Sequence, residues 1–250
     1  MKTKLKLYNY FTNPIYISLF ILALLVLITI NRPMMCDEGI WHYIGRLWID
    51  NDMPPYKYSM ENKNPAIFEL YALSDYLFGT NYMFVRLLGI FAVVLSMNII
   101  RKITELLHSK TAGIYAMYIY GLTSTWYLLD GQWPSVTENF MCLFYCLAFY
   151  YLIKSGNHKK KNYFLFLTGI FTGIAISFKQ IALFGLLGLL IYYLINQFSN
   201  KSLSQHSKSI FLIAIGTLFS SVIFLLPVFL SGVSLKEYFD GAWLILLNPG

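Results

Sequence analysis

Membrane-length apolar runs, separated by shorter polar segments, recur along this 250-residue chain. An α-helix of about 17–25 apolar residues crosses a bilayer, whereas a barrel strand needs only about 10. Lipid offers no hydrogen-bond partners, so each run must pair its backbone groups within a helix. The pattern predicts an all-α, polytopic membrane helical bundle with seven crossings, at Pro14–Ile30, Met83–Ile100, Thr111–Leu129, Thr137–Ile153, Tyr163–Phe178, Ile181–Phe198 and Ile210–Leu230.

The segment between the first two crossings, residues 32–82, contains two further helical patterns. The first is expected to begin at Asp37 as the N-cap, because a short acidic side chain accepts hydrogen bonds from a free first turn. Its spacing puts an apolar face opposite a polar one. The apolar face is Ile40, Trp41, Ile44, Leu47 and Trp48, and the polar face is Glu38, His42 and Arg46.

A second helix is predicted to begin at Asn64-Pro65, a cap followed by proline at the first helical position. Its apolar side is expected to hold Ile67, Leu70, Tyr71, Ser74, Leu77 and Phe78. Neither helix is apolar enough to cross a bilayer. Both are therefore expected to lie along the membrane interface, with tryptophan and tyrosine at headgroup level.

The charged residues predict the orientation of the bundle. Hydrophobic residues make up 57% of the chain and charged residues 12%. With the N-terminus inside, the inner segments hold twelve of the nineteen Lys and Arg residues, but Glu105 is their only acid. Basic loops face the cytoplasm. The N-terminus is thus expected to be cytoplasmic and residues 32–82 to form an outer loop. The net charge of +7 follows from this topology and gives no indication of nucleic-acid binding.

Several polar motifs follow one another in an order that resembles a known family. Asp37-Glu38 opens the first outer helix, Glu61-Asn62-Lys63-Asn64-Pro65 opens the second, and Val85-Arg86-Leu87 follows. Glu138 then opens the fourth crossing and Lys179 closes the fifth. The ordered set resembles the N-terminal half of the GT-C membrane glycosyltransferases. It is most similar to the branch of protein O-mannosyltransferases and lipid A aminoarabinose transferases.

The resemblance implies a multi-pass enzyme of the cell (plasma or inner) membrane. It would transfer a sugar from a polyprenyl-phosphate-linked donor to a protein, lipid or glycan acceptor on the outer or periplasmic face, with inversion. Residues 1–250 would form a single transmembrane domain, and residues 32–82 would hold the active site. Relatives have more crossings, so the domain is expected to be incomplete at its C-terminus.

Two carboxylates are the catalytic candidates. Glycosyl transfer requires a base for the acceptor proton, and an oxocarbenium-like transition state favours a nearby carboxylate. Asp37 is the candidate base and Glu138 the second catalytic acid. The alternatives are that Asp37 caps its helix and that Glu138 stabilises a helix N-terminus. Glu138 is placed near the outer boundary of a crossing, where an ionisable group suggests function.

Three cations are candidates for holding the donor phosphate as charge builds on it: Lys63, Arg86 and Lys179. Lys179 could instead extend to the lipid headgroups. A salt bridge from Arg86 to Asp75 or Glu69 is a second alternative. Glu38 and His42 complete the predicted substrate-binding set; Glu38 would position the acceptor, orient Arg46 or remain a solvated acid.

No cofactor is expected. One histidine among scattered acids is not the pattern of a metal site, which leaves a divalent cation open but unsupported. An isoprenoid tail would lie among Tyr115, Tyr118, Tyr120, Trp126, Tyr127 and Trp133, unless these residues only pack at the interface. Two other classes of function stay open, a polytopic transporter and a non-catalytic truncated relative. No internal repeat of the kind common in transporters is visible.

Overall fold

The computed structural model describes residues 13–59, 61–124, 133–156, 159–197 and 203–244. Within these ranges every regular element is an α-helix. The helices are α2 (Pro14–Thr29), α3 (Cys36–Asn51), α4 (Ala66–Phe78), α5 (Met83–Leu107), α6 (Lys110–Thr123), α7 (Thr137–Lys154), α8 (Lys161–Phe178), α9 (Ala182–Gln197), α10 (Leu203–Leu230) and α11 (Leu235–Ala242).

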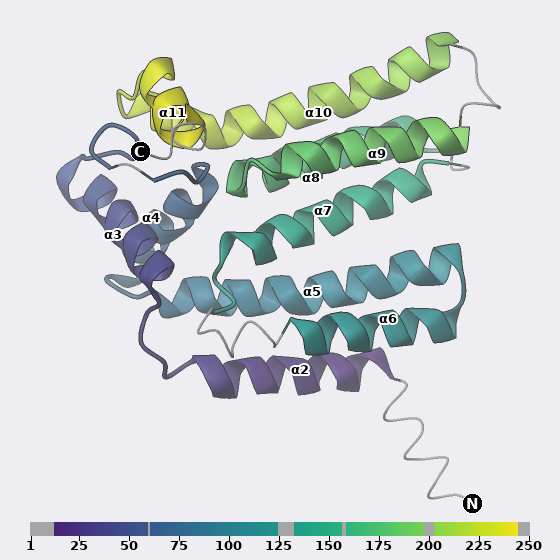
Figure 1. Cartoon of the computed structure of the whole chain (residues 1–250), viewed down its shortest axis with the longest axis horizontal. Helices are drawn as coiled ribbons and strands as arrows, with labels where there is room; N and C mark the ends of the chain where they lie inside the picture. Colours follow the sequence, from purple (N-terminus) through teal and green to yellow (C-terminus); the bar gives the residue numbers. More distant parts are fainter. Residues whose placement is uncertain (1–12, 60, 125–132, 157–158, 198–202, 245–250) are drawn as a thin grey trace, which may run out of the picture.

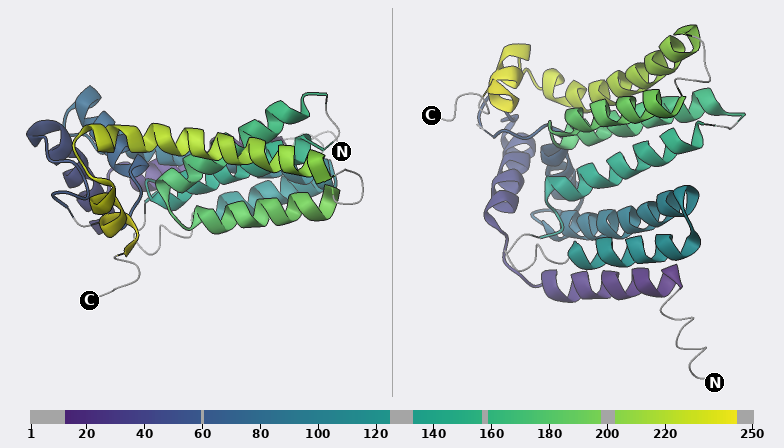
Figure 2. Two further views of the ribbon diagram at one scale, coloured as in Figure 1. Left: turned by 90° about the horizontal axis from the view of Figure 1, so that it is seen from above. Right: turned by 45° about the vertical axis from the view of Figure 1, so that its right-hand side comes forward.

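The long helices α2 and α5 to α10 lie side by side in one bundle (Figure 1). Along the chain they alternate in direction, and the principal contacts join α2 to α5, α5 to α6 and α7, and α8 to α7 and α10. The shorter helices α3, α4 and α11 gather at one end of this bundle, and α3 lies crosswise to it (Figure 2). We call this the α3/α4 end. It is the end that the charge pattern predicts to be outer.

Within the part of the chain that the structure describes, three helices are both long and apolar enough to cross a membrane: Met83–Leu107, Lys161–Phe178 and Ser204–Leu230. Helices α2 and α9 are apolar but shorter. Large apolar side chains point outward from the bundle; Leu27, Phe184 and Leu230, for example, are each more than 70% exposed. An outer surface of this kind is stable in lipid and not in water. The predicted class, an all-α membrane helical protein, is confirmed.

Glycines permit the closest helix contact, between α8 and α10. A Cβ atom added to Gly169 would lie 2.1 Å from the carbonyl oxygen of Ile213, and one added to Gly173 would lie 2.3 Å from that of Thr217. Small residues of this kind let helix backbones approach each other in membrane proteins. The α8–α10 contact in turn fixes the end of α8, from which the candidate site is built.

Both helices of the 32–82 segment form, but their predicted caps are wrong. Met35 is the N-cap of α3, and its backbone N–H is accepted by Glu38 at 3.2 Å; Asp37 is an exposed residue of the first turn. Pro65 is the N-cap of α4, because the Asn64 side chain turns into the core. A local hydrogen bond between Glu38 and the Met35 backbone replaces the first predicted cap, and tertiary hydrogen bonds of Asn64 replace the second.

The apolar faces of these two helices are partly as predicted. Trp41 and Ile44 of α3 pack with Ile67 and Tyr71 of α4 in one buried cluster, which also includes Phe140, Phe178 and Tyr238 of α7, α8 and α11. Ile40, Leu77 and Phe78 are instead exposed. The cluster attaches α3 and α4 to the end of the bundle, so that polar residues from several helices meet there.

Candidate active site

A cavity of about 570 Å³ opens at the α3/α4 end, beside the short connection between α8 and α9. Two predicted phosphate-binding residues, Lys63 and Lys179, line it together although they are far apart in sequence. The other lining residues are Asn62, Gln180, Ile181, Leu183, Phe184 and Trp243. Lys63 and Lys179 form one edge of the cavity, which we call the cationic edge. The walls of the cavity are apolar, and one of them is the exposed side of α9.

Lys179 enters the site because α8 ends directly before it. Helix α8 stops at Phe178, Lys179 has extended backbone, and α9 begins at Ala182. Its ammonium group forms an ion pair with Oε1 of Glu138, while the Thr137 hydroxyl donates to Oε2 at 3.0 Å. Glu138 lies in the first turn of α7, and its side chain is 44% exposed. The structure therefore brings two predicted site residues into contact at the edge of the cavity.

Lys63 is held by neighbours in its own loop. Its Nζ atom donates to Oδ1 of Asn62 at 2.7 Å and to Oε1 of Glu61 at 3.2 Å, and lies 5.8 Å from the centre of the Trp41 ring. An ammonium group has three N–H donors. Two of these contact described residues, which leaves one for a ligand in the cavity.

Asp37 is exposed and does not line the cavity. It forms no hydrogen bond or ion pair with another described residue. Residues four apart lie on the same side of a helix, so Asp37 is one turn from Trp41, above whose ring Lys63 lies. Asp37 is therefore on the same side of α3 as Trp41, with a carboxylate that is open to solvent.

Glu38 and Arg86 form a separate cluster in which both side chains are fully buried. Arg86 donates from Nε to Oε1 of Glu38 at 2.8 Å and from Nη2 to Oε2 at 2.6 Å. Its remaining donors bind the carbonyl oxygens of Thr29, Arg32 and Pro33 at 2.6–2.8 Å. All five N–H donors of the guanidinium thus have partners.

This cluster overturns several predicted alternatives. Glu38 is not a solvated acid and does not orient Arg46, which pairs with Asp50 at 3.0 Å on the surface. Arg86 does not pair with Asp75 or Glu69. The periodicity placed Glu38 on a polar face correctly, but the end of α5 covers that face and buries it.

His42 is also buried, one turn after Glu38. Its Nε2 atom lies 2.8 Å from Oδ1 of Asp75, and its ring lies beside those of Tyr71 and Tyr82. The pair joins α3 to α4. His42 therefore faces neither water nor the cavity.

Sequence analysis missed the contribution of the chain after α10. Ser234 and Glu237 form a reciprocal capping box that starts α11, and this S-x-x-E pattern was visible in the sequence. Helix α11 brings Trp243 to the cavity and Tyr238 to Oδ1 of Asn64, at 3.2 Å. Gln180 was missed as well, because no local pattern distinguishes it from a surface amide.

The predicted aromatic groove lies only partly within the described residues. Trp133 donates from Nε1 to the Pro33 carbonyl at 2.9 Å and lies against Arg86. Tyr115 is exposed on α6, and Trp126 and Tyr127 lie outside the described residues. Apolar walls beside the two lysines come instead from α9 and Trp243.

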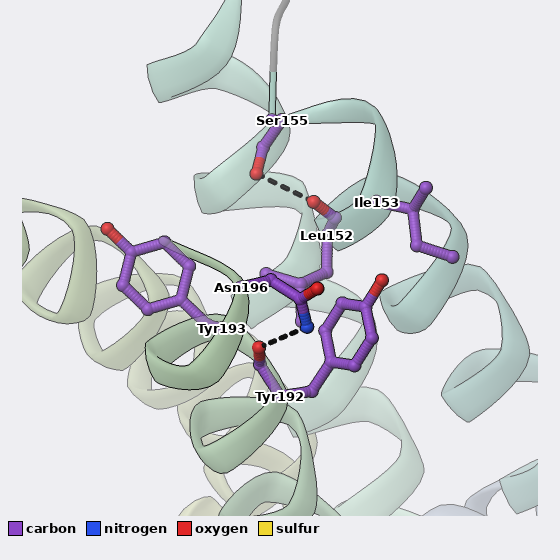
Figure 3. A pocket seen from close by; sticks show the side chains of 7 residues that line it. Leu152, Ile153, Ser155, Tyr192, Tyr193 and Asn196 are labelled. Atoms are coloured by element: carbon purple, nitrogen blue, oxygen red, sulfur yellow. Dashed lines mark hydrogen bonds between the residues drawn. The ribbon is translucent and has the colours of Figure 1, made fainter. Parts of the chain in front are cut away.

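A second cavity, of about 150 Å³, lies at the opposite end of the bundle, between the C-terminal turns of α7 and α9 (Figure 3). Its polar side chains bind the backbone: Ser155 donates to the Leu152 carbonyl at 2.7 Å and Asn196 to that of Tyr192 at 2.9 Å. The lining residues are uncharged. This cavity therefore offers no carboxylate and no cation, and the chemistry is better sought at the α3/α4 end.

Comparison with known proteins identifies the family of this chain. Residues 62–225 match the family described as dolichyl-phosphate-mannose-protein mannosyltransferase, a range that includes Lys63, Arg86, Glu138 and Lys179. No curated protein matches the chain. The family match covers more than half of the sequence and coincides with the all-α membrane bundle and its cationic cavity. The chain therefore belongs to the dolichyl-phosphate-mannose-protein mannosyltransferase family of GT-C membrane glycosyltransferases.

Proposed function

We propose that this glycosyltransferase takes its sugar from a polyprenyl-phosphate-linked donor and transfers it, with inversion, to an acceptor on the outer face of the membrane. The observation that carries the proposal is the cavity lined by both Lys63 and Lys179 and by the apolar residues Ile181, Leu183, Phe184 and Trp243. A lipid phosphate matches this lining, because its anionic phosphate can bind the two lysines and its long apolar tail can pack against the apolar residues.

Electrostatics support a phosphate at the cationic edge. Lys63 and Lys179 each retain donor capacity after their contacts with Glu61 and Glu138. Charge-assisted hydrogen bonds to phosphate are stronger than neutral ones. They also strengthen during the reaction, because negative charge builds on the phosphate oxygen as the glycosidic bond breaks. The tail would then extend along the exposed face of α9 into lipid.

Asp37 is proposed as the base. In a single displacement the acceptor O–H gives its proton to the Asp37 carboxylate and its oxygen forms a bond to the anomeric carbon. The bond from that carbon to the phosphate oxygen breaks on the opposite face, and its electron pair leaves with the polyprenyl phosphate. An exposed carboxylate without a described partner can accept the proton. Glu138 orients Lys179 and lies close enough to the phosphate to favour positive charge on the sugar.

Glu38, Arg86 and His42 are proposed to act by holding α3 in place. Binding of substrate by Arg86 would require one of its five present hydrogen bonds to break. His42 is engaged with Asp75 in the same way. These residues instead fix the helix that presents Asp37. Under this proposal residues 32–82 supply the base, and residues 133–184 supply most of the donor site.

The test is to reconstitute the chain in vesicles with a labelled polyprenyl-phosphate sugar and to measure transfer together with binding of the lipid. Asp37→Asn and Glu138→Gln are expected to lower the transfer rate by about 100-fold or more, the usual contribution of a positioned acid or base. Asp50→Asn is the matched control, because Asp50 is an exposed acid on the same helix.

Two results would contradict the proposal separately. Equal rates for the wild type and Asp37→Asn would remove Asp37 as the base. Binding of polyprenyl phosphate no tighter than binding of the uncharged polyprenol would remove the donor class, because the two lysines would then not be recognising phosphate.

A further inference from the structure

Gln180 follows Lys179 in the α8–α9 connection and contacts two remote segments at once. Its side chain is buried, with 7% of the residue exposed. The amide nitrogen donates to the Asn62 carbonyl at 2.7 Å and also to the Ala242 carbonyl. These carbonyls belong to residues 118 and 62 positions away in sequence. One side chain therefore joins three parts of the chain at the edge of the cavity.

The Ala242 carbonyl needs an external partner. Ala242 is the last residue of α11, and the last carbonyl groups of a helix do not accept a hydrogen bond from an N–H group of the same helix. A buried carbonyl without a hydrogen bond is unfavourable, so Gln180 stabilises the end of α11 where it stands. The Asn62 carbonyl belongs to a loop with no regular structure of its own. Gln180 thus gives both segments a hydrogen-bond partner.

Each bonded carbonyl directly precedes a residue that lines the cavity. Lys63 follows Asn62, and Trp243 follows Ala242. Lys179, which also lines the cavity, directly precedes Gln180 itself. The amide is consequently one residue away from both lysines and from the aromatic wall, and it sets their spacing through the backbone.

A second set of contacts ties the same segments without Gln180. The Tyr238 hydroxyl donates to Asn64 at 3.2 Å and accepts from Nε1 of Trp243 at 3.3 Å. Gly241 lies against the Tyr56 ring, where an added Cβ atom would be 2.8 Å from a ring carbon. These contacts hold α11 near the loop, so loss of Gln180 alone is expected to loosen the site and not to unfold the protein.

We propose that Gln180 is a positioning residue for the lipid-linked donor. It holds Lys63 and Trp243 against Lys179, so that both ammonium groups reach one phosphate while the indole faces the first part of the tail. The inference rests on the proposed function, because it gives a role to the same cavity. Gln180 itself does not need to touch the donor.

The decisive variant is Gln180→Met, which keeps the length of the side chain and adds no charge but removes both donors. We expect the donor KM to rise about tenfold, the effect of losing one or two hydrogen bonds, while kcat changes less than about twofold. Gln180→Asn, one methylene shorter, is expected to reach at most one carbonyl and to give a smaller rise. Gln205→Met is the control, since Gln205 is exposed on α10.

Hydrogen exchange measured on the same samples separates this inference from the proposed function. Peptides covering residues 61–64 and 235–243 should exchange faster in Gln180→Met than in the wild type. Unchanged exchange there, or a fall in kcat that follows the folded fraction at constant KM, would overturn the positioning role. Absence of polyprenyl-phosphate binding by the wild type would instead overturn the proposed function, and the donor role of Gln180 with it.

Discussion

Two acid–base pairs at the same end of the bundle differ in how completely they are enclosed. Glu38–Arg86 and Glu138–Lys179 each join an acid in the first turn of a helix to a cation from another part of the chain. The first pair is completely buried, whereas the side chains of the second are 44% and 28% exposed. Residues of similar type therefore occupy opposite environments a short distance apart.

The two pairs also differ in how many of their hydrogen-bond donors are left without a partner. Every donor of Arg86 is occupied, and Glu38 also accepts from Ser135 and from the Met35 backbone. The ammonium group of Lys179 forms a hydrogen bond with Glu138 alone among the described residues, and it borders a cavity. A fully buried pair whose hydrogen-bond donors are all occupied can hold helices together, but it has no free group that could bind a substrate. An unsaturated pair beside a cavity can exchange a partner for a phosphate.

The largest effect on the contrast between the two pairs is expected from replacing Arg86, the cation of the buried pair. Arg86→Met leaves the Glu38 carboxylate buried without its cation, which is expected to destabilise the fold by about 3–5 kcal/mol. Thermal unfolding and the yield of monodisperse protein would measure the loss. Arg46→Met is the matched control, because the exposed Arg46–Asp50 pair is worth about 0–1 kcal/mol.

A double variant shows whether the loss comes from the lone charge. Glu38→Gln combined with Arg86→Met removes both charges and should recover part of the stability that Arg86→Met loses. If Arg86→Met were as stable as the wild type but unable to bind polyprenyl phosphate, Arg86 would be a substrate ligand and the contrast between the two pairs would fail.

A smaller effect, on binding, is expected at the open pair. Lys179→Met should weaken polyprenyl-phosphate binding by about 10–100-fold, because hydrogen bonds to charged groups contribute roughly 1.5–3 kcal/mol. Stability should change little, since the pair is partly exposed. Lys154→Met, at the other end of α7, is the control for loss of a lysine. A large fall in stability with unchanged binding would place Lys179 in the structural class with Arg86.

Much of the fold was predictable because membrane crossing imposes a simple pattern. Length and apolarity located every long helix, since lipid allows few alternatives to a helix. The ends were less predictable: the sequence put caps at Asp37 and Asn64, where local propensity favours them. Glu38 and Asn64 instead satisfy remote partners, and no local pattern reports such partners.

The candidate site was predictable as a list of residues but not as a set of contacts. The sequence identified Lys63, Glu138 and Lys179, and the structure brings them to one cavity edge. The sequence could not distinguish the buried Arg86 from the two lysines at the cavity, because the burial of Arg86 depends on how α3 packs against α5. Gln180 was unpredictable for a related reason, since its role exists only once α11 has folded beside it.

Glu69 differs from both pairs, because it is a partly buried carboxyl group that forms no ion pair with a described residue. Its Oε1 atom is buried without a hydrogen bond to a described residue, and burial raises the pKa of Glu69 to about 8. An unfolded glutamate titrates near 4.3. Between these values the folded state holds a proton that the unfolded state has released, so stability falls as the pH rises from about 4.5 to 8.

Glu69→Gln removes this dependence and gives the smallest expected effect. The stability of the variant relative to the wild type should rise by at least about 1 kcal/mol from pH 5 to pH 8, because the cost of burying an amide is the same at both pH values and cancels in this comparison. Thermal midpoints in lipid nanodiscs at the two pH values measure it. Glu237→Gln is the control: hydrogen bonds from the Ser234 backbone and hydroxyl lower the pKa of Glu237, so its stabilisation is lost only as the pH falls below the unfolded pKa, and the difference between this variant and the wild type should be the same at both pH values. A Glu69→Gln variant with the same pH dependence as the wild type would show that this carboxyl group is charged and has a partner, as in the two pairs.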